Sequence, residues 1–273
     1  MSNLITRAIW GALFVGILVV AILLNGVFLP IVLGLIVMLG IAEFLNLFKH
    51  STTTTIKPSK LIGIIGGLVL YTVVLLNGNE LLHIDVISLI VPIIFIPFIS
   101  ILFSKNKNPL IDLSVTFFSW IYVLIPILLI AEISAFQVDG LPAWTFVLGL
   151  FILVWTNDTF AYLAGISFGK HKLFERISPK KTWEGFIGGL LFTVLIAYLY
   201  AFFTQSETVF WVCAAVLIAP TSVFGDLIES RFKRLADVKD SGTLIPGHGG
   251  ILDRIDALLY AAPFFYLLFS LFY

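Results

Sequence analysis

Nine long apolar stretches follow one another along this chain of 273 residues, and they constrain its fold more than any other feature. A helix needs about 20 mostly apolar residues to cross a bilayer, and its backbone polar groups must bond within the segment. The stretches therefore predict a polytopic bundle of about nine transmembrane helices. They cover residues 8–24, 27–48, 61–77, 86–103, 113–132, 143–165, 184–204, 208–228 and 255–272.

The composition agrees with an all-α integral membrane protein. Hydrophobic residues make up 60% of the chain and charged residues only 12%, whereas an ordinary soluble domain is about 25% charged. This shortage of charge excludes a soluble globular enzyme and a disordered chain, and the zero net charge excludes a nucleic-acid binder that relies on basic charge. The single cysteine, Cys213, excludes an intrachain disulfide.

The charges between the stretches predict the orientation of the helices. If the N-terminus lies in the cytoplasm, all 16 Lys and Arg residues fall on the cytoplasmic side, which is the usual signal for orientation. Nine helices then place the C-terminus outside, and we expect the protein in the cytoplasmic (inner) membrane. Eight or ten crossings are the alternatives, because Asn25-Gly26 leaves a short gap and Pro92 and Pro97 interrupt the fourth stretch.

The two parts of the chain differ in their chemistry. Residues 1–142 are interpreted as scaffold helices, because they offer few charged groups. Residues 143–273 are interpreted as the catalytic region, with cytoplasmic loops at 166–183 and 229–254. Glu43 is an ionisable residue inside the second stretch, but its place near the cytoplasmic end favours a structural role.

Five carboxylates fall at the cytoplasmic ends of the predicted helices. Asp226 and Glu229 are three residues apart and share one helical face. Asp253 and Asp256 have the same spacing, and Asp158 lies at the same predicted depth. Such acids repel one another unless a cation lies between them, and oxygen ligands favour Mg²⁺, with Mn²⁺ as the alternative. Ordinary ion pairs with nearby Lys and Arg residues are the other explanation.

Two further features suit phosphate groups. Gly249 and Gly250 follow His248 and lead into a predicted helix N-terminus, which favours anions, although a flexible turn also explains the glycines. The sequence leaves open whether His248 is an acid–base group, a phosphate donor or a support of the loop. The pair Lys180-Lys181 suits either anionic lipid head groups or substrate phosphates.

The stretch from Ser230 to Asp256 resembles the signature of the phosphatidate cytidylyltransferases, also called CDP-diacylglycerol synthases. Three shorter segments, 158–162, 178–185 and 225–230, also resemble motifs of this family. The resemblance covers residues 155–257. Its matching residues in the signature are Ser230, Phe232, Lys233, Arg234, Lys239, Asp240, Gly242, Ile245, Pro246, His248, Gly249, Gly250, Ile251, Asp253, Arg254, Ile255 and Asp256.

The resemblance implies a membrane nucleotidyltransferase of phospholipid biosynthesis that uses Mg²⁺ to make CDP-diacylglycerol and pyrophosphate from CTP and phosphatidate. The number of carboxylates leaves room for a second cation, whose identity the sequence does not indicate. The expected metal ligands are Asp226, Asp253, Asp256, Asp158 and Glu229. The expected catalytic residues are Asp226, Asp253, Asp256, Lys239 and His248. The residues expected to bind substrate phosphates are Lys180, Lys181, Arg234, Arg254, Gly249 and Gly250.

Two other functions stay open at this point. Another CTP-dependent lipid enzyme, such as a polyprenol kinase, would also combine a metal, a nucleotide and a lipid phosphate. An ion or phosphate transporter would also carry carboxylates within its helices, but it would need them near the middle of the bilayer. The expected partners are CTP, phosphatidate and membrane lipid at an active site facing the cytoplasm, with no nucleic acid; a homodimer is compatible with a small bundle.

Overall fold

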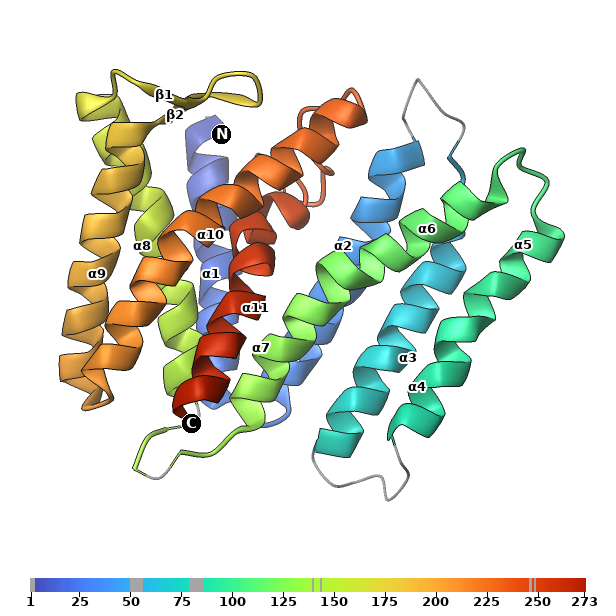
Figure 1. Cartoon of the computed structure of the whole chain (residues 1–273), viewed down its shortest axis with the longest axis horizontal. Coiled ribbons are helices and arrows are strands. Elements are labelled where there is room, and N and C mark those ends of the chain that lie inside the picture. The colour runs from blue at the N-terminus through green and yellow to red at the C-terminus, as the bar shows by residue number, and fades with distance from the viewer. Residues whose placement is uncertain are drawn as a thin grey trace. The chain divides into compact units, whose positions relative to one another are not determined.

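The computed structural model describes residues 3–49, 56–78, 86–138, 140–142, 144–245, 247 and 249–273. These residues are mostly helical (Figure 1). The helices are α1 (Asn3–Leu24), α2 (Phe28–Lys49), α3 (Lys60–Gly78), α4 (Val86–Phe95), α5 (Ile99–Phe103), α6 (Pro109–Ser119), α7 (Ile125–Ala135), α8 (Trp144–Phe168), α9 (Trp183–Thr204), α10 (Thr208–Leu235) and α11 (Leu252–Phe272). Strands β1 (Lys172–Phe174) and β2 (Ser178–Thr182) form an antiparallel hairpin.

Seven helical segments of the described chain are long and apolar enough to cross a membrane. They are Phe28–Lys49, Lys60–Asn77, Pro109–Ala135, Trp144–Phe168, Trp183–Thr204, Thr208–Leu235 and Leu252–Phe272. Two shorter apolar helices, Ala8–Leu24 and Ile87–Phe103, fall at the other two stretches of the sequence. The expected class, an all-α polytopic membrane protein, is therefore confirmed, while the count of nine crossings and the sides of the termini stay predictions.

The breaks between helices have local causes. Asn25 and Gly26 adopt left-handed backbone angles, with φ of 46° and 49°, and so form the short turn between α1 and α2. Pro97 lies in the 3-10 turn η1 (Ile96–Phe98) between α4 and α5, where its missing N–H is tolerated. Pro126 follows the π-helical turn η2 (Trp120–Leu124), a wider turn of the kind that absorbs such a lost bond.

The chain forms two compact units. The first contains Met1–Ala135 and Phe232–Arg254, and the second contains Phe136–Arg231 and Ile255–Tyr273. Most of the segment that resembles the signature, residues 232–254, therefore groups with the first seven helices, while its ends, including Asp256, belong to the second unit. The functional division at residue 142 stays a prediction, because compactness does not test which residues take part in catalysis.

An aromatic cluster attaches the signature segment to the helices of the first unit. The rings of Phe44 and Phe232 have centroids 5.8 Å apart, and those of Tyr122 and Phe232 are 5.3 Å apart. Phe48 and Phe118 complete the cluster at 6.0 Å and 5.8 Å from Phe232. Because aromatic pairs contribute about 0.5–1.5 kcal/mol each beyond area burial, Phe232 is held firmly beside α2.

Helix α3 in the same unit has a glycine, Gly66, where the ring of Trp120 packs. Trp120 lies against Gly66, and its indole Nε1 donates a hydrogen bond of 2.8 Å to the carbonyl oxygen of Gly63. A Cβ atom on Gly66 would lie 2.5 Å from Trp120 Cζ2. The absence of a side chain at this position therefore allows η2 to pack directly on the backbone of α3, as small residues do between membrane helices.

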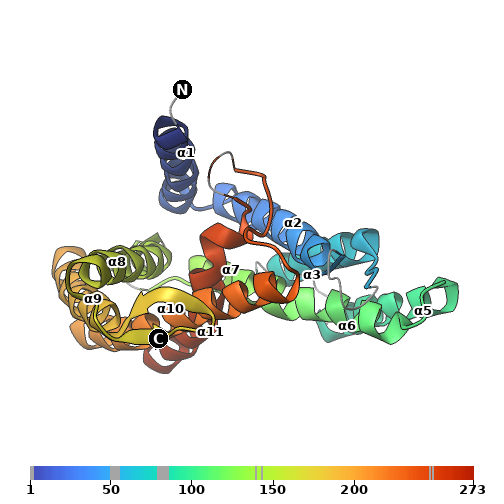
Figure 2. The same ribbon diagram turned by 90° about the horizontal axis from the view of Figure 1, so that it is seen from above.

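In the second unit, α8 and α9 pack side by side along their length (Figures 1 and 2). Glycines of α9 permit this approach: a Cβ on Gly185 would lie 2.7 Å from the carbonyl oxygen of Ala161, and one on Gly189 would lie 2.8 Å from Asn157 Oδ1. The hairpin that joins the two helices pairs Lys172 with Thr182. The predicted loop 166–183 thus contains a short sheet.

Helix α10 is longer than the sequence suggested. It ends at Leu235, so the first seven residues of the predicted loop 229–254 are helical. The prediction ended the helix where the apolar run ends, at residue 228. The charged residues that follow include no proline or glycine before Leu235, so they continue the helix after the hydrophobic pattern stops.

We predict that Gly66→Ala destabilises the protein by about 1–3 kcal/mol, because the added methyl group overlaps the Trp120 ring. Gly16→Ala is the matched control, since no atom lies within 4 Å of a Cβ at that position and alanine is about 1 kcal/mol better than glycine in a helix. Thermal unfolding in detergent measures both variants. Equal midpoints would show that the ring does not pack on Gly66 as described.

Candidate active site

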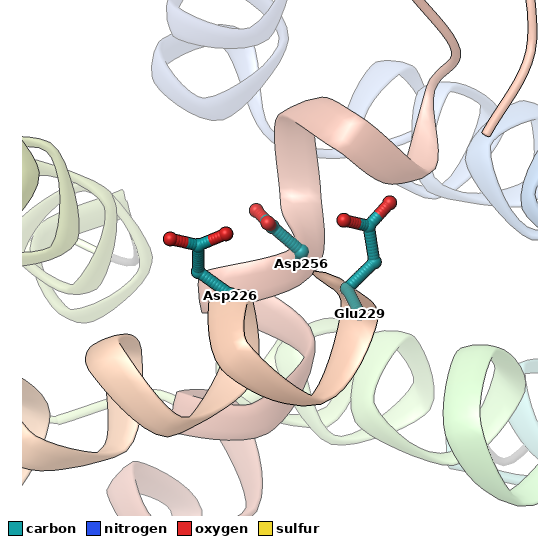
Figure 3. Close-up of side chains that lie close together, drawn as sticks. All are labelled: Asp226, Glu229 and Asp256. Carbon is teal, nitrogen blue, oxygen red and sulfur yellow. The ribbon is translucent and has the colours of Figure 1, made fainter. Parts of the chain in front are cut away.

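Three carboxylates meet in the second unit where α10 and α11 pack together. Asp226 and Glu229 extend from α10 and Asp256 from α11, and one oxygen of each lies within 4.8 Å of the others. The three side chains project to the same side of the two helices (Figure 3). The structure therefore brings together three of the five residues predicted as metal ligands; that role itself stays a prediction.

Gly225 is the reason that these acids meet. A Cβ at this position would lie 2.6 Å from the carbonyl oxygen of Asp256 and 2.9 Å from the Cα of Ala257. The backbones of α10 and α11 thus touch at Gly225, directly before Asp226. Close contact between the helices brings the carboxylates from their facing turns into one small volume.

Lys181 points from strand β2 toward this cluster. Its Nζ lies 2.6 Å from Asp226 Oδ2 and 3.5 Å from the carbonyl oxygen of Val223. Asp158 on α8 lies within electrostatic range of Lys181 and Asp226. One lysine among four carboxylates leaves this group of residues with net negative charge, and carboxylate oxygens around such a site suit a hard divalent cation.

The base of the hairpin is fixed by Glu184, the residue after Trp183 in the SPKKTWEG segment. Its carboxylate accepts a 3.0 Å hydrogen bond from the backbone N–H of Lys170 and lies 2.6 Å from His171 Nδ1. The Thr182 hydroxyl oxygen accepts from the Gly185 N–H at 3.1 Å and so caps α9. These contacts hold the C-terminal end of β2, the strand that carries Lys181, beside the residues that precede β1.

Asp253 is not among the three gathered acids. In the first unit its Oδ1 accepts a 2.7 Å hydrogen bond from Lys233 Nζ. Its Oδ2 accepts from the N–H of Ser241 at 2.9 Å, from the Ser241 hydroxyl at 3.0 Å and from the N–H of Gly250 at 2.8 Å. The chain's own donors therefore engage both oxygens of this predicted metal ligand, and its assignment to metal stays a prediction.

The glycine-rich segment binds anions, but in the structure they belong to the chain itself. The N–H of Gly250 donates to Asp253, and the N–H groups of Ile251 and Leu252 donate to Glu43 at 2.9 Å and 3.0 Å. Gly249 has a φ of +86°, and a Cβ there would lie 2.5 Å from Asp253 Oδ2. The assignment of Gly249 and Gly250 to substrate phosphate stays a prediction.

The remaining predicted residues fall into two groups. His248 lies outside the described residues. Four predicted cations have exposed side chains, which leaves them accessible to soluble phosphates; they are Lys180, Arg234, Lys239 and Arg254. Of these, Arg234 donates a 3.4 Å hydrogen bond to the carbonyl oxygen of Val238.

Two residues without a predicted site role, Lys233 and Glu43, belong to the hydrogen-bond network around Asp253 in the first unit. Lys233 lies one turn after Glu229 on the face of α10 that also carries Asp226, a spacing that becomes visible only when the helix continues to Leu235. Glu43 was a lone acid in an apolar helix, and that signal was present. Its partners, however, lie more than 190 residues away in the sequence, where no local pattern could identify them.

The sequence matches the cytidylyltransferase family over residues 5–272. The phosphatidate cytidylyltransferase of Staphylococcus haemolyticus is 36% identical over 247 residues, covering 89% of this chain and 90% of that relative. The enzyme of the same name from Staphylococcus aureus strain COL is 34% identical over 244 residues, covering 87% and 92%. A third, from Haemophilus influenzae, is 42% identical over 166 residues; this chain spans 57% of its length.

We predict that Lys233→Met lowers the free energy of unfolding by about 3 kcal/mol or more, because it strands a buried carboxylate. The side chains of Lys233 and Asp253 are only 13% and 5% exposed. Lys107→Met, at an exposed position, is the control and should unfold like the wild type. Thermal unfolding in detergent makes the comparison, and identical midpoints for the two variants would contradict a stabilising role of the ion pair.

Proposed function

We propose that this chain, which belongs to the cytidylyltransferase family, is a phosphatidate cytidylyltransferase that makes CDP-diacylglycerol and pyrophosphate from CTP and phosphatidate. The observation that carries the proposal is the carboxylate cluster of Asp226, Glu229 and Asp256 in a multi-pass membrane protein. It suits the cation that a nucleotide substrate brings or requires, and it lies on apolar helices, within reach of a lipid.

The reaction joins two very different substrates. Phosphatidate is held in the leaflet by its acyl chains, whereas CTP is a soluble, highly charged nucleotide. A site at the ends of membrane helices can receive both. We place this site on the cytoplasmic side of the inner membrane, because all 16 Lys and Arg residues fall on that side in the nine-helix topology.

The chemistry requires positioning more than covalent assistance. An oxygen of the phosphatidate phosphate attacks the α-phosphorus of CTP, the bond from that phosphorus to the β-phosphate oxygen breaks, and pyrophosphate leaves. A phosphate monoester has a second pKa of about 6, so at neutral pH most of it is already ionised. A strong general base is therefore unnecessary, and His248 need not act as one.

Asp226, Glu229 and Asp256 would hold Mg²⁺, with Mn²⁺ as the alternative and Asp158 as a further ligand or part of a second cation site. When bound, the cation neutralises negative charge on the phosphate oxygens. Lys181, which pairs with Asp226 in the structure, is placed to add its charge to the same phosphates.

The other expected residues are four exposed cations and Asp253. The exposed side chains of Lys180, Arg234, Lys239 and Arg254 suit the phosphates of a soluble nucleotide. Asp253 accepts hydrogen bonds from both Ser241 and Gly250 and so holds these two residues together. In this proposal Asp253 fixes the start of α11, and its predicted part in metal binding stays open to the same assay.

The test is a label-transfer assay with purified protein in detergent. With phosphatidate and Mg²⁺, label from the α-phosphate of CTP should enter the lipid phase together with equimolar release of pyrophosphate. Transfer of the γ-phosphate label alone would identify a lipid kinase. No transfer by folded protein that still binds cations would contradict both enzymes and leave the transporter.

Within that assay, Asp226→Asn and Asp256→Asn should each lower kcat by about 100-fold or more. Each change removes a carboxylate that would hold the cation, and the cation would neutralise the charge on the reacting phosphates. Chelation of Mg²⁺ should abolish turnover, and added Mg²⁺ should restore it. Glu132→Gln, which changes an exposed acid of α7, is the matched control and should retain full activity. Wild-type turnover by either aspartate variant would overturn its assignment.

A separate prediction concerns orientation. In a Cys213→Ser background, a membrane-impermeant maleimide should label Glu207→Cys in intact spheroplasts but Lys107→Cys only after lysis, because the nine-helix topology puts three crossings between them. The background protein, with its single cysteine removed, should stay unlabelled. The reverse pattern would indicate the opposite orientation in the membrane. Labelling of both sites from outside would contradict the predicted number of crossings between them.

A further inference from the structure

Glu43 is an acid of helix α2 that carries no signature motif, yet it lies at the centre of the network around the signature segment. Its side chain is buried, with the residue 9% exposed. Oε1 accepts a 2.9 Å hydrogen bond from the N–H of Ile251, and Oε2 accepts a 3.0 Å hydrogen bond from the N–H of Leu252. Both oxygens are therefore engaged by consecutive amides at the start of α11.

A third contact joins Glu43 to the other carboxylate of the network. The hydroxyl of Ser241 lies 3.1 Å from Glu43 Oε2 and 3.0 Å from Asp253 Oδ2. The N–H of Ser241 also donates to Asp253. Glu43 is thus connected through one serine to the residue whose second oxygen binds Lys233.

The glycines of the signature segment are shaped around this carboxylate. A Cβ on Gly242 would lie 2.7 Å from Glu43 Oε1. A Cβ on Gly250 would overlap Glu43 Oε2 and the Ser241 hydroxyl. Glycine at these two positions is therefore what allows the chain to close around Glu43.

The contact also satisfies a physical need of α11. The first N–H groups of a helix lack intrahelical partners, and negative charge is favoured at that end. Asp253 reaches back to the N–H of Gly250 from within the helix, and Glu43 takes the next two amides from a different helix. Together the two carboxylates fix both the position and the direction of the start of α11.

We propose that Glu43 is a positioning residue of the cytidylyl-transfer site: it holds Ser241, Ile251 and Leu252 in place so that α11 presents its acids correctly. The inference rests on the proposed function. Glu43 acts through the backbone amides and Ser241, not on the substrate, because its oxygens already accept hydrogen bonds from the chain. Asp256 follows four residues after Leu252 on the same helix, so the placement of that start affects this metal ligand.

Glu43→Gln tests the proposal because it keeps the size of the side chain but replaces one acceptor oxygen with a donor. Hydrogen exchange measured by mass spectrometry should speed up in peptides covering residues 241–252 and stay unchanged elsewhere. The Mg²⁺ concentration for half-maximal rate should rise about 10-fold or more, as is usual when residues that support metal ligands are changed. Loss of folded protein alone would lower the rate without moving that concentration.

Glu132→Gln is the matched control: the same change in the same unit, at an exposed acid, should alter neither measurement. Should Glu43→Gln fail to fold, Ser241→Ala removes only the bridging hydroxyl, and it should shift both measurements in the same direction by a smaller amount. Unchanged exchange in 241–252 in a folded variant would overturn the role in holding the segment. Faster exchange with an unchanged Mg²⁺ requirement would overturn the positioning role.

The two proposals can fail separately. If the wild-type protein makes no CDP-diacylglycerol, the proposed function is wrong. The exchange measurement needs no substrate, so local protection lost in Glu43→Gln would still establish that Glu43 holds this segment.

Discussion

Buried carboxylates among apolar helices are the constraint on which the described structure depends. An acid removed from water is costly unless hydrogen bonds or a cation compensate it. In the first unit the compensation comes from the chain: Glu43 binds amides of the signature segment, and Asp253 binds Lys233 and further amides. In the second unit Lys181 compensates Asp226, and the chemistry of the remaining acids suits a divalent cation. Buried carboxylates are thus compensated by fixed protein donors in the first unit, whereas those of the second unit suit a bound cation.

Much of the fold could be predicted from the sequence because lipid leaves few options. Each apolar stretch coincides with helix in the described residues, since a chain in a bilayer must bond its backbone internally. Local chemistry also fixed the turn at Asn25 and the break at Pro97. The end of α10 was placed too early, because hydrophobicity marks where lipid contact ends and not where helical hydrogen bonding ends. The hairpin at β1 and β2 was missed for a related reason: its charged residues carry no apolar alternation.

The candidate site was predictable to the extent that its residues are close in sequence. Helical spacing joined Asp226 to Glu229, and the structure adds Asp256 through the contact at Gly225. Tertiary partners were beyond such reasoning. Ser241 and Glu43 are separated by 198 residues, and nothing in the pattern around either residue identifies the other.

The glycine-rich segment shows that a local motif can indicate the chemistry of a partner without identifying which partner it is. Glycines before a helix N-terminus expose amides that bind an oxyanion, and a substrate phosphate and a protein carboxylate satisfy them equally well. The sequence predicted that these amides bind an anion, and the structure identifies Glu43 and Asp253 as anions at these amides. The invariant physical need is negative charge at the start of α11. A buried acid on another helix meets this need permanently, so the helix start is ordered before any nucleotide arrives, and the substrate need not supply the charge that organises its own site.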